Sequence, residues 1–306
     1  MSRIHEALKR AEQEQAAKRG GLPTNDPIAA DFRSGLRDLS SRSVAASVSP
    51  AAANSAVVAL EPELGRCPKF DWKPDAATML FTSGNDGVRG TEEFRTLRSR
   101  LYHLREKMNL KTVLITSALP KEGKSFTAAN LAQVLVRQHG RRVLLIDADL
   151  RRPRLHQMLG TAAGPGLSDY LLGSSDEFSI MQRGQIENLF FVPGGSVIDN
   201  PAELVGNGRL QMLFERLAPL FDWIIVDSPP AVPVSDASVL AKFCDGVLMV
   251  VRSNSTPADV ARKARQEFPE ESLVGMVLNG TSDEAVPYAR YYYETYEKKK
   301  SAQSQG

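Results

Sequence analysis

The stretch KTVLITSALPKEGKSFTAANLAQVLVRQHG, residues 111–140, contains the feature that determines the fold class of this chain. It opens with a short apolar run that is rich in β-branched residues, which predicts a buried strand. A loop over 118–125 follows, and then a helical segment that stops at Gly140. A strand, a Gly-Lys-Ser loop and a helix together direct backbone N–H groups at a phosphate. The stretch therefore predicts a phosphate site beyond the end of a strand.

The loop has P-loop spacing, with Ala118 where the first glycine usually stands. Gly123 lets the backbone approach phosphate, Lys124 reaches the β- and γ-phosphates, and the Ser125 hydroxyl binds Mg²⁺. We expect Lys121 to point to solvent. The predicted nucleotide-binding residues of this segment are Ala118, Leu119, Pro120, Lys121, Glu122, Gly123, Lys124, Ser125 and Phe126.

The rest of the domain repeats the alternation of apolar strands and helices. Further strands are expected at 141–149, 189–195, 222–230, 245–253 and 272–280, and further helices at 91–108, 201–220, 235–243 and 256–268, with a possible break at the glycines of the 201–220 helix. The strands are continuous apolar runs, which are typical of a parallel sheet covered on both faces. The sequence therefore predicts an α/β fold with a doubly wound, mostly parallel sheet.

Carboxylates follow two of these strands. Asp147 and Asp149 end one apolar run, and Asp227 ends another at the Walker B position. Ligands of doubly wound sheets bind beyond the carboxyl ends of the strands, and Mg²⁺ prefers oxygen ligands. We therefore expect these residues to lie beside the phosphate loop. The alternative for Asp147 or Asp149 is a helix cap or a turn residue.

The chain of 306 residues divides into four parts by composition. Residues 1–20 form a short amphipathic helix, for which partner docking and fraying are equally favoured. A largely disordered linker rich in Ala, Ser, Pro and Val is expected over 21–84, although its CPKFDWKP stretch has the composition of a locally packed segment. The P-loop domain is expected over 85–282, and the tail over 283–306 holds five of the seven tyrosines.

Bulk properties exclude several classes of function. The formal net charge of +2 is too small to indicate a nucleic-acid partner. No apolar run is long enough to span a membrane, and the N-terminus lacks the apolar core of a signal peptide. We therefore expect a cytoplasmic protein in which Cys67 and Cys244 are free thiols.

Three motifs and the tyrosine-rich tail resemble the bacterial tyrosine kinases (BY-kinases) of capsule and exopolysaccharide assembly. They are SALPKEGKS at 117–125, VLLIDADLRRP at 143–153 and DWIIVDSPP at 222–230, and the resemblance covers roughly 85–300. It implies a MinD/ParA-like P-loop fold. Glu92, Arg95 and Arg98 match the E-x-x-R-x-x-R oligomerisation motif of these kinases, although i,i+3 charge pairs on a solvated face would explain the same pattern.

The resemblance also implies roles for individual residues. Lys124 and Ser125 bind the phosphates of ATP and Mg²⁺, Asp147 is the base toward the tyrosine hydroxyl, and Asp149 and Asp227 support the metal. Asn279 stands where relatives of this fold contact adenine. The implied reaction is ATP-dependent autophosphorylation of the tail in trans, with Tyr291, Tyr292, Tyr293 and Tyr296 preferred as acceptors over Tyr288.

The implied partners are other copies of the chain, in a possible ring, and a separate membrane-spanning activator of the polysaccharide co-polymerase class. That activator would recruit the kinase to the inner face of the plasma membrane, and protein tyrosines would be the substrates. One departure is Lys121, because these kinases usually have glycine there.

Two other classes of function compete with a kinase. A MinD/ParA-type ATPase for positioning or partitioning carries a signature lysine early in the loop, where this chain has Leu119. A nucleotide-sensing adaptor would be expected to lack part of the set formed by Lys124, Ser125 and the three aspartates. A tyrosine kinase is therefore the favoured hypothesis.

Overall fold

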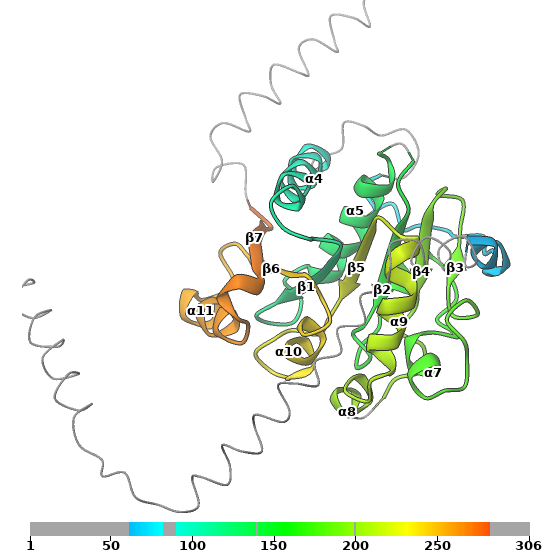
Figure 1. Ribbon diagram of the computed structural model, residues 1–306. Coiled ribbons are helices and arrows are strands. Elements are labelled where there is room, and N and C mark those ends of the chain that lie inside the picture. Colours follow the sequence, from blue (N-terminus) through cyan, green and yellow to red (C-terminus); the bar gives the residue numbers. More distant parts are fainter. Residues whose placement is uncertain (1–60, 82–89, 139, 199, 282–306) are drawn as a thin grey trace, which may run out of the picture. The chain divides into compact units, whose positions relative to one another are not determined.

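A computed structural model of the chain describes residues 61–81, 90–138, 140–198 and 200–281. These residues belong to one compact unit (Figure 1). The predicted N-terminal helix, the linker up to residue 60 and the tyrosine-rich tail lie outside the described residues.

The described residues form a sheet of seven strands in the order β3-β4-β2-β5-β1-β6-β7. Every neighbouring pair is parallel except β3 and β4, which are antiparallel. The prediction of a doubly wound, mostly parallel sheet is therefore confirmed. The strands are β1 (Thr112–Ser117), β2 (Val143–Asp147), β3 (Gln182–Arg183), β4 (Leu189–Val192), β5 (Trp223–Asp227), β6 (Gly246–Arg252) and β7 (Leu273–Asn279).

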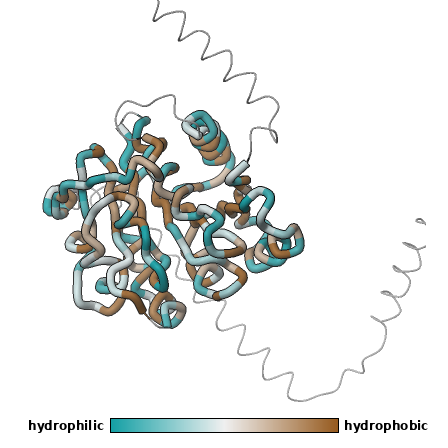
Figure 2. The backbone as a smooth tube through the Cα atoms, turned by 180° about the vertical axis from the view of Figure 1, so that it is seen from behind, coloured by the Kyte–Doolittle hydropathy of each residue, from teal (hydrophilic) through white to brown (hydrophobic). Residues whose placement is uncertain are grey.

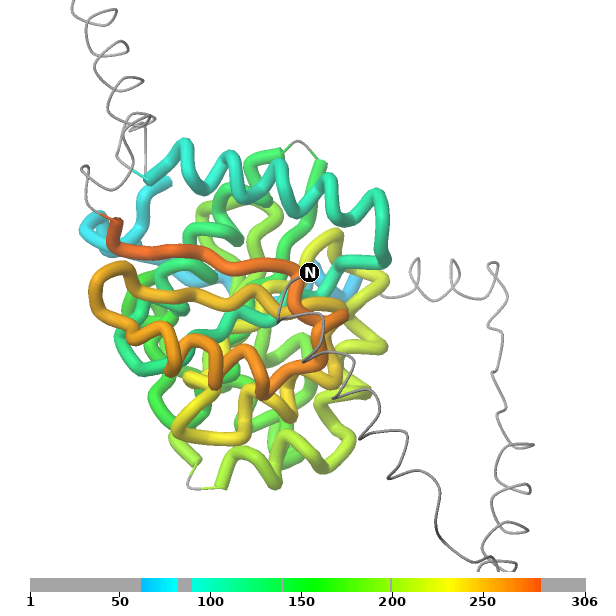
Figure 3. The backbone as a smooth tube through the Cα atoms, turned by 90° about the vertical axis from the view of Figure 1, so that its left-hand side faces the viewer, coloured from blue at the N-terminus to red at the C-terminus, as the bar shows by residue number. Residues whose placement is uncertain are grey.

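Helices cover both faces of this sheet (Figure 1). The α-helices are α4 (Thr91–Arg105), α5 (Lys124–Val136), α6 (Leu155–Leu159), α7 (Leu167–Leu171), α8 (Pro201–Val205), α9 (Arg209–Leu217), α10 (Asp236–Ala241) and α11 (Ala258–Gln266). Three short 3₁₀ segments are η1 (Glu61–Arg66), η2 (Ala218–Leu220) and η3 (Glu270–Ser272). Figure 3 shows β7 at the near edge of the sheet, with α4 above it and α11 below it.

The sheet separates two hydrophobic cores. In β1, Val113 and Ile115 face the core that contains α4 and α5, whereas Leu114 faces the core that contains α7, α9 and α10. Both faces are therefore buried, and for this reason the strand is a continuous apolar run without polar alternation. Figure 2 shows hydrophobic stretches through the middle of the unit and hydrophilic stretches mostly on its outer turns.

Residues 61–81 are part of the folded unit, so the predicted linker over 21–84 is wrong for this segment. Trp72 is buried and packs edge-on against Phe191, with 6.3 Å between the ring centroids. The Phe70 N–H donates to the Arg183 carbonyl at 2.8 Å, which attaches the segment beside β3. The sequence predicted a linker here because polar and small residues outnumber the few large apolar residues of the segment. Only the CPKFDWKP stretch indicated local packing.

The sequence also missed short elements. No strand was predicted at β3 and no helix at α6 or α7, because elements of two to five residues show no clear periodicity. The predicted helix over 201–220 is divided into α8 and α9, and the φ of 84° at Gly208 places the break at the glycines.

Replacement of Trp72 by alanine tests whether this segment contributes to the fold. We expect Trp72→Ala to lower the free energy of unfolding by about 3–5 kcal/mol, because it opens a cavity beside Phe191. Urea unfolding of the full chain measures this, with Lys73→Ala at the exposed neighbouring position as the control. Equal stability of the two variants would mean that the segment is not anchored.

Candidate nucleotide-binding site

The phosphate loop joins the end of β1 to the start of α5. Gly123 caps α5 with φ of 100°, and Lys121 has φ of 67°, so two loop residues adopt left-handed backbone conformations. A side chain at such a position is strained, which explains physically why glycine is usual where Lys121 stands. The Lys121 residue is exposed, as predicted.

Two loop residues have side chains committed to packing. Ala118 is fully buried in the core beneath the loop, and Phe126 packs edge-on against Phe94 of α4 at 5.9 Å between ring centroids. Both are predicted nucleotide-binding residues. Their packing leaves mainly their backbone groups to face a nucleotide.

Lys124 lies at the centre of the site. Its Nζ donates to Asp149 Oδ2 at 2.8 Å, lies 3.4 Å from the Ser125 hydroxyl oxygen and 4.0 Å from Asp227 Oδ1. Burial by itself lowers the pKa of Lys124, but the Asp227 and Asp149 carboxylates outweigh burial and raise that pKa. The ends of β1, β2 and β5 thus bring together one ammonium group and the predicted acidic residues.

Asp227 has two carboxylate oxygens without a well-formed hydrogen bond. Both are buried, and neither accepts a hydrogen bond from the described residues, although the Ser125 hydroxyl lies close by. Burial raises the pKa of Asp227 to about 6, against the opposing effect of Lys124. A buried carboxylate with free lone pairs beside a hydroxyl fits a hydrated Mg²⁺ ion, which is bound through oxygen atoms and retained waters.

Asp147 is directed at the start of α6. Its Oδ2 accepts the N–H groups of Arg154 and Leu155, both at 2.9 Å, and its Oδ1 accepts the Asp149 N–H at 3.3 Å. The helix-capping alternative is therefore present in the structure. Burial and the nearby Asp227 raise the pKa of Asp147 to about 8, and the assignment of Asp147 as the base stays a prediction.

Asn279, at the end of β7, contacts the phosphate loop. Its Nδ2 donates to the Glu122 carbonyl at 2.9 Å. A Cβ on Gly123 would lie 2.0 Å from the same Nδ2, so only glycine fits there. The predicted adenine-contacting residue is thus attached to the loop itself.

The sequence did not predict the contacts of several residues that support this site, among them Arg151, for which a phosphate or subunit contact and an exposed turn charge were the alternatives. Arg151 forms a two-pronged ion pair with the buried Asp236, at 2.7 and 3.0 Å, which ties the segment after β2 to α10. Thr256 and Arg252 contact the phosphate loop from the end of β6. An Arg-Asp pair 85 positions apart and a lone threonine have no local sequence signal.

The three residues of the oligomerisation motif lie on α4. Arg95 pairs with Glu92, which is the i,i+3 charge pair considered as the alternative from the sequence. Arg98 Nη1 donates to the Val134 carbonyl of α5 at 3.0 Å. These contacts are compatible with an interface, and the oligomerisation role stays a prediction.

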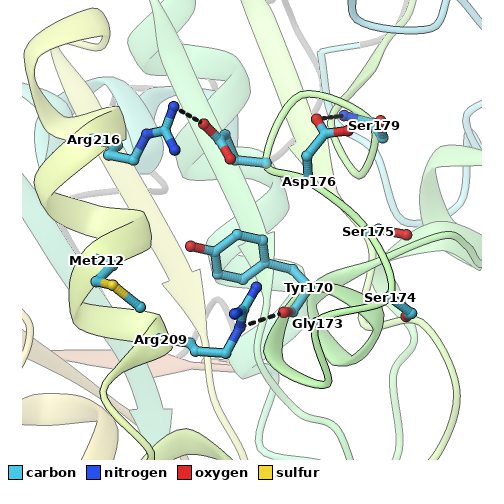
Figure 4. Close-up of a pocket in the computed structure, with 10 residues that line it drawn as sticks. Tyr170, Gly173, Ser174, Ser175, Asp176, Ser179, Arg209, Met212 and Arg216 are labelled. Carbon is cyan, nitrogen blue, oxygen red and sulfur yellow. Dashed lines mark hydrogen bonds and ion pairs between the residues drawn. The ribbon is translucent and has the colours of Figure 1, made fainter.

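A separate hollow of about 600 Å³ lies between α7, the turn that follows it and α9. Figure 4 shows Tyr170, Arg209, Met212 and Arg216 around it. None of the predicted site residues lines this hollow. The phosphate loop, and not this hollow, carries the concentration of chemically active groups.

The matching family is the CobQ/CobB/MinD/ParA nucleotide binding domain, which covers residues 113–286. The chain is 36% identical to tyrosine-protein kinase YwqD of Bacillus subtilis over 192 residues, which covers 62% of this chain and 81% of YwqD. It is 33% identical to tyrosine-protein kinase CpsD of Streptococcus agalactiae over 208 residues, which covers 67% of this chain and 90% of CpsD.

A solved structure agrees with these matches. The kinase domain of Escherichia coli tyrosine kinase ETK superposes with a TM-score of 0.61 and 32% identity, over 64% of this chain and 78% of that domain. Fold and sequence similarity thus point to the same group of proteins.

Because the pKa of Asp227 is raised, we expect the Asp227→Asn substitution to increase the free energy of unfolding by an amount that depends on pH. A carboxyl whose pKa rises on folding, here from 3.8 to about 6, stabilises the fold less as pH increases through that range. The advantage of Asp227→Asn over the original chain should therefore grow by up to about 3 kcal/mol between pH 4 and pH 7. Urea unfolding without nucleotide or Mg²⁺ measures it.

Asp222→Asn is the matched control. Burial raises the pKa of Asp222, but hydrogen bonds from the Arg142 N–H and the Arg141 side chain outweigh it and hold the pKa below the ordinary value. Its replacement should therefore cost stability by an amount that grows as pH rises up to about pH 4 and then stays nearly constant between pH 4 and pH 7, in contrast to Asp227→Asn. A pH-independent difference for Asp227→Asn would contradict the electrostatic description of the site.

Proposed function

The chain belongs to the bacterial tyrosine-protein kinases and carries a CobQ/CobB/MinD/ParA nucleotide binding domain, and from this premise we propose that it phosphorylates its own C-terminal tyrosines in trans. The observation that supports this most directly is the convergence of Lys124, Ser125, Asp149 and Asp227 at the carboxyl ends of β1, β2 and β5. Phosphoryl transfer requires positioning and charge neutralisation more than covalent chemistry, and these residues supply both.

Lys124 and the loop would bind the ATP phosphates. The first N–H groups of α5 have no partner within the helix and face the loop, so they attract anions. Lys124 remains charged among its carboxylates and reaches the β- and γ-phosphate oxygens from there. Asn279 at Gly123 would hold the loop and adjoin the nucleotide base.

Mg²⁺ would be held by the Ser125 hydroxyl and, through water, by Asp227 and Asp149. When bound, the ion neutralises charge on the β- and γ-phosphate oxygens. The free lone pairs of Asp227 support this assignment. Asp149, which accepts a hydrogen bond from Lys124 in this structure, would contribute a carboxylate oxygen toward the hydrated ion.

The acceptor would be a tail tyrosine of another copy: Tyr288, Tyr291, Tyr292, Tyr293 or Tyr296. A phenol with an ordinary pKa of about 10 is a weak nucleophile at neutral pH and benefits from a carboxylate that accepts its proton. We assign this role to Asp147 through Oδ1, which accepts only one long bond, whereas Oδ2 is held by two N–H groups. Burial and the nearby Asp227 raise the pKa of Asp147, which makes its ionised carboxylate a stronger proton acceptor than that of an ordinary aspartate.

The biological setting we propose is control of capsule or exopolysaccharide synthesis or export. The relatives include tyrosine-protein kinase CpsD and a kinase named for a cps region of Klebsiella pneumoniae. Within the described residues, no helix is long and apolar enough to cross a membrane. A membrane-spanning activator of the polysaccharide co-polymerase class would recruit the kinase to the inner face of the plasma membrane.

A MinD/ParA-type ATPase without kinase activity is the less supported alternative. Such an enzyme would use a lysine early in the loop, and Leu119 stands there. The relatives at 33% and 36% identity are tyrosine-protein kinases. The tail tyrosines would also have no role in such an ATPase.

Complementary variants test transfer between copies. A full chain with Lys124→Met cannot donate phosphate, and a full chain with the five tail tyrosines changed to Phe cannot accept it. After mixing with ATP, Mg²⁺ and the activator, mass spectrometry should find phosphotyrosine on the Lys124→Met tail. If phosphotyrosine formed in the original chain but not in the mixture of variants, transfer would occur within one copy and not between copies. ATP hydrolysis without any phosphotyrosine would favour the ATPase.

Arg95→Ala together with Arg98→Ala tests the oligomerisation motif. If α4 forms the interface between copies, the double variant should elute as a smaller species on a sizing column and lose most phosphotyrosine. Autophosphorylation should also make the assembly smaller, because each phosphate adds roughly −1.5 to −2 charges to a tail near an acidic site. This expectation would be contradicted if a phosphorylated sample eluted as a larger assembly than the Lys124→Met variant.

A further inference from the structure

We propose that Glu122 is a positioning residue that holds the phosphate loop in its nucleotide-binding shape through the Thr256 hydroxyl. This inference rests on the nucleotide-binding role proposed above and assigns the device that sets the loop. The three residues concerned, Glu122, Thr256 and Asn279, are called the loop clasp below.

Glu122 is a buried carboxylate within a loop that binds anions. It is only 3% exposed. Its Oε2 accepts the Leu119 N–H at 2.7 Å, which bridges the loop from its start to its end. Its Oε1 accepts the Thr256 hydroxyl. Both oxygens are therefore satisfied by groups that are not on a nucleotide.

Thr256 connects the loop to the segment that follows β6. Its hydroxyl oxygen accepts the Arg252 N–H at 3.2 Å while its proton is donated to Glu122. Arg252 adds a direct contact, because its Nη1 donates to the Lys121 carbonyl at 3.0 Å. Two side chains from one turn thus hold consecutive residues of the phosphate loop.

Asn279 completes the loop clasp from the end of β7. Its Nδ2 donates to the Glu122 carbonyl and lies against Gly123, as described above. In the sequence, β7 is followed directly by the segment that leads to the tail tyrosines. The loop is therefore held by the same strand end from which the substrate tail departs.

A loop of this shape requires external support. Lys121 has φ of 67° without being glycine, a conformation that persists only where surrounding contacts impose it. Glu122 and its neighbours supply such contacts on both sides of the Lys121 peptide. Without them, we expect the loop to relax and its N–H groups to lose their common direction.

The charge of Glu122 opposes phosphate binding, which separates the proposal from a simple charge effect. A solvated carboxylate near the site would only repel phosphate, so its removal in any form would tighten ATP binding. A positioning residue behaves differently. A glutamine retains a carbonyl for the Leu119 N–H and an amide for the Thr256 oxygen, whereas an alanine loses both contacts.

The test is calorimetric titration of the full-length protein with ATP and Mg²⁺. We expect Glu122→Ala to weaken binding roughly tenfold, since two buried hydrogen bonds are lost. Glu122→Gln should bind as tightly as the original chain or up to several-fold more tightly. Thr256→Val should weaken binding roughly three- to tenfold, whereas Thr256→Ser keeps the hydroxyl and should bind ATP like the original chain. Ser255→Ala, at the exposed neighbouring position, is the control.

A double-mutant cycle tests the contact itself. If Glu122 acts through Thr256, the Glu122→Ala and Thr256→Val effects will be less than additive, because each removes the same hydrogen bond. In steady-state phosphorylation with the activator, Thr256→Val should raise the KM for ATP more than it lowers kcat. Thermal unfolding identifies any variant that fails to fold. If Glu122→Ala does not fold, ATP binding by Thr256→Val tests the proposal by itself.

Three results would overturn the proposal. They are equal binding by Glu122→Ala and Glu122→Gln, full additivity of the two substitutions, and unchanged binding by Thr256→Val. If the original chain binds ATP but one of these results is found, the positioning role of Glu122 is wrong and the proposed kinase function still stands. No ATP binding by the original chain would overturn both.

Discussion

The structure depends on one buried ammonium group held among carboxylates. Lys124 contacts Asp149 and lies near Asp227, and all three groups are largely removed from water. Isolated burial of any of these charges would be costly, and the attraction between the Lys124 ammonium and the two carboxylates offsets part of that cost. The cluster is possible because parallel strands end at one edge of the sheet, which brings together residues more than a hundred positions apart. A ligand with phosphates and a divalent cation carries the same two kinds of charge.

The surroundings of this cluster act mainly as a frame. The Arg151–Asp236 pair fixes the segment after β2, Asp147 caps α6 close to it, and the ends of β6 and β7 hold the phosphate loop. Ala118 and Phe126 add to this support, since they pack beneath the loop and beside it at its two ends. Such a site is organised before a nucleotide binds, and charge stabilisation in phosphoryl transfer depends on organisation of this kind.

Local pattern predicted much of this arrangement. The strands other than β3, the helices other than α6 and α7, and the polar residues at the ends of β1, β2 and β5 were recognisable, because each signal lies within a few consecutive residues. The exceptions share a physical cause. The packing of Trp72 on Phe191 and the pairing of Arg151 with Asp236 join distant parts of the chain, and nothing adjacent to either residue indicates its partner. The division of α8 from α9 was only partly visible, in the glycines between them.

The sequence alone determined the fold class, the phosphate loop and the acidic residues that accompany it, because buried strands and Gly-Lys-Ser loops have strong local signatures. Tertiary structure determined how those residues are used. It turned Asp147 toward α6, left the oxygens of Asp227 free, and placed Glu122 against Thr256 and Asn279 against Gly123. These contacts depend on side-chain direction and on the approach of distant segments, and both arise only when the sheet and its helices pack together.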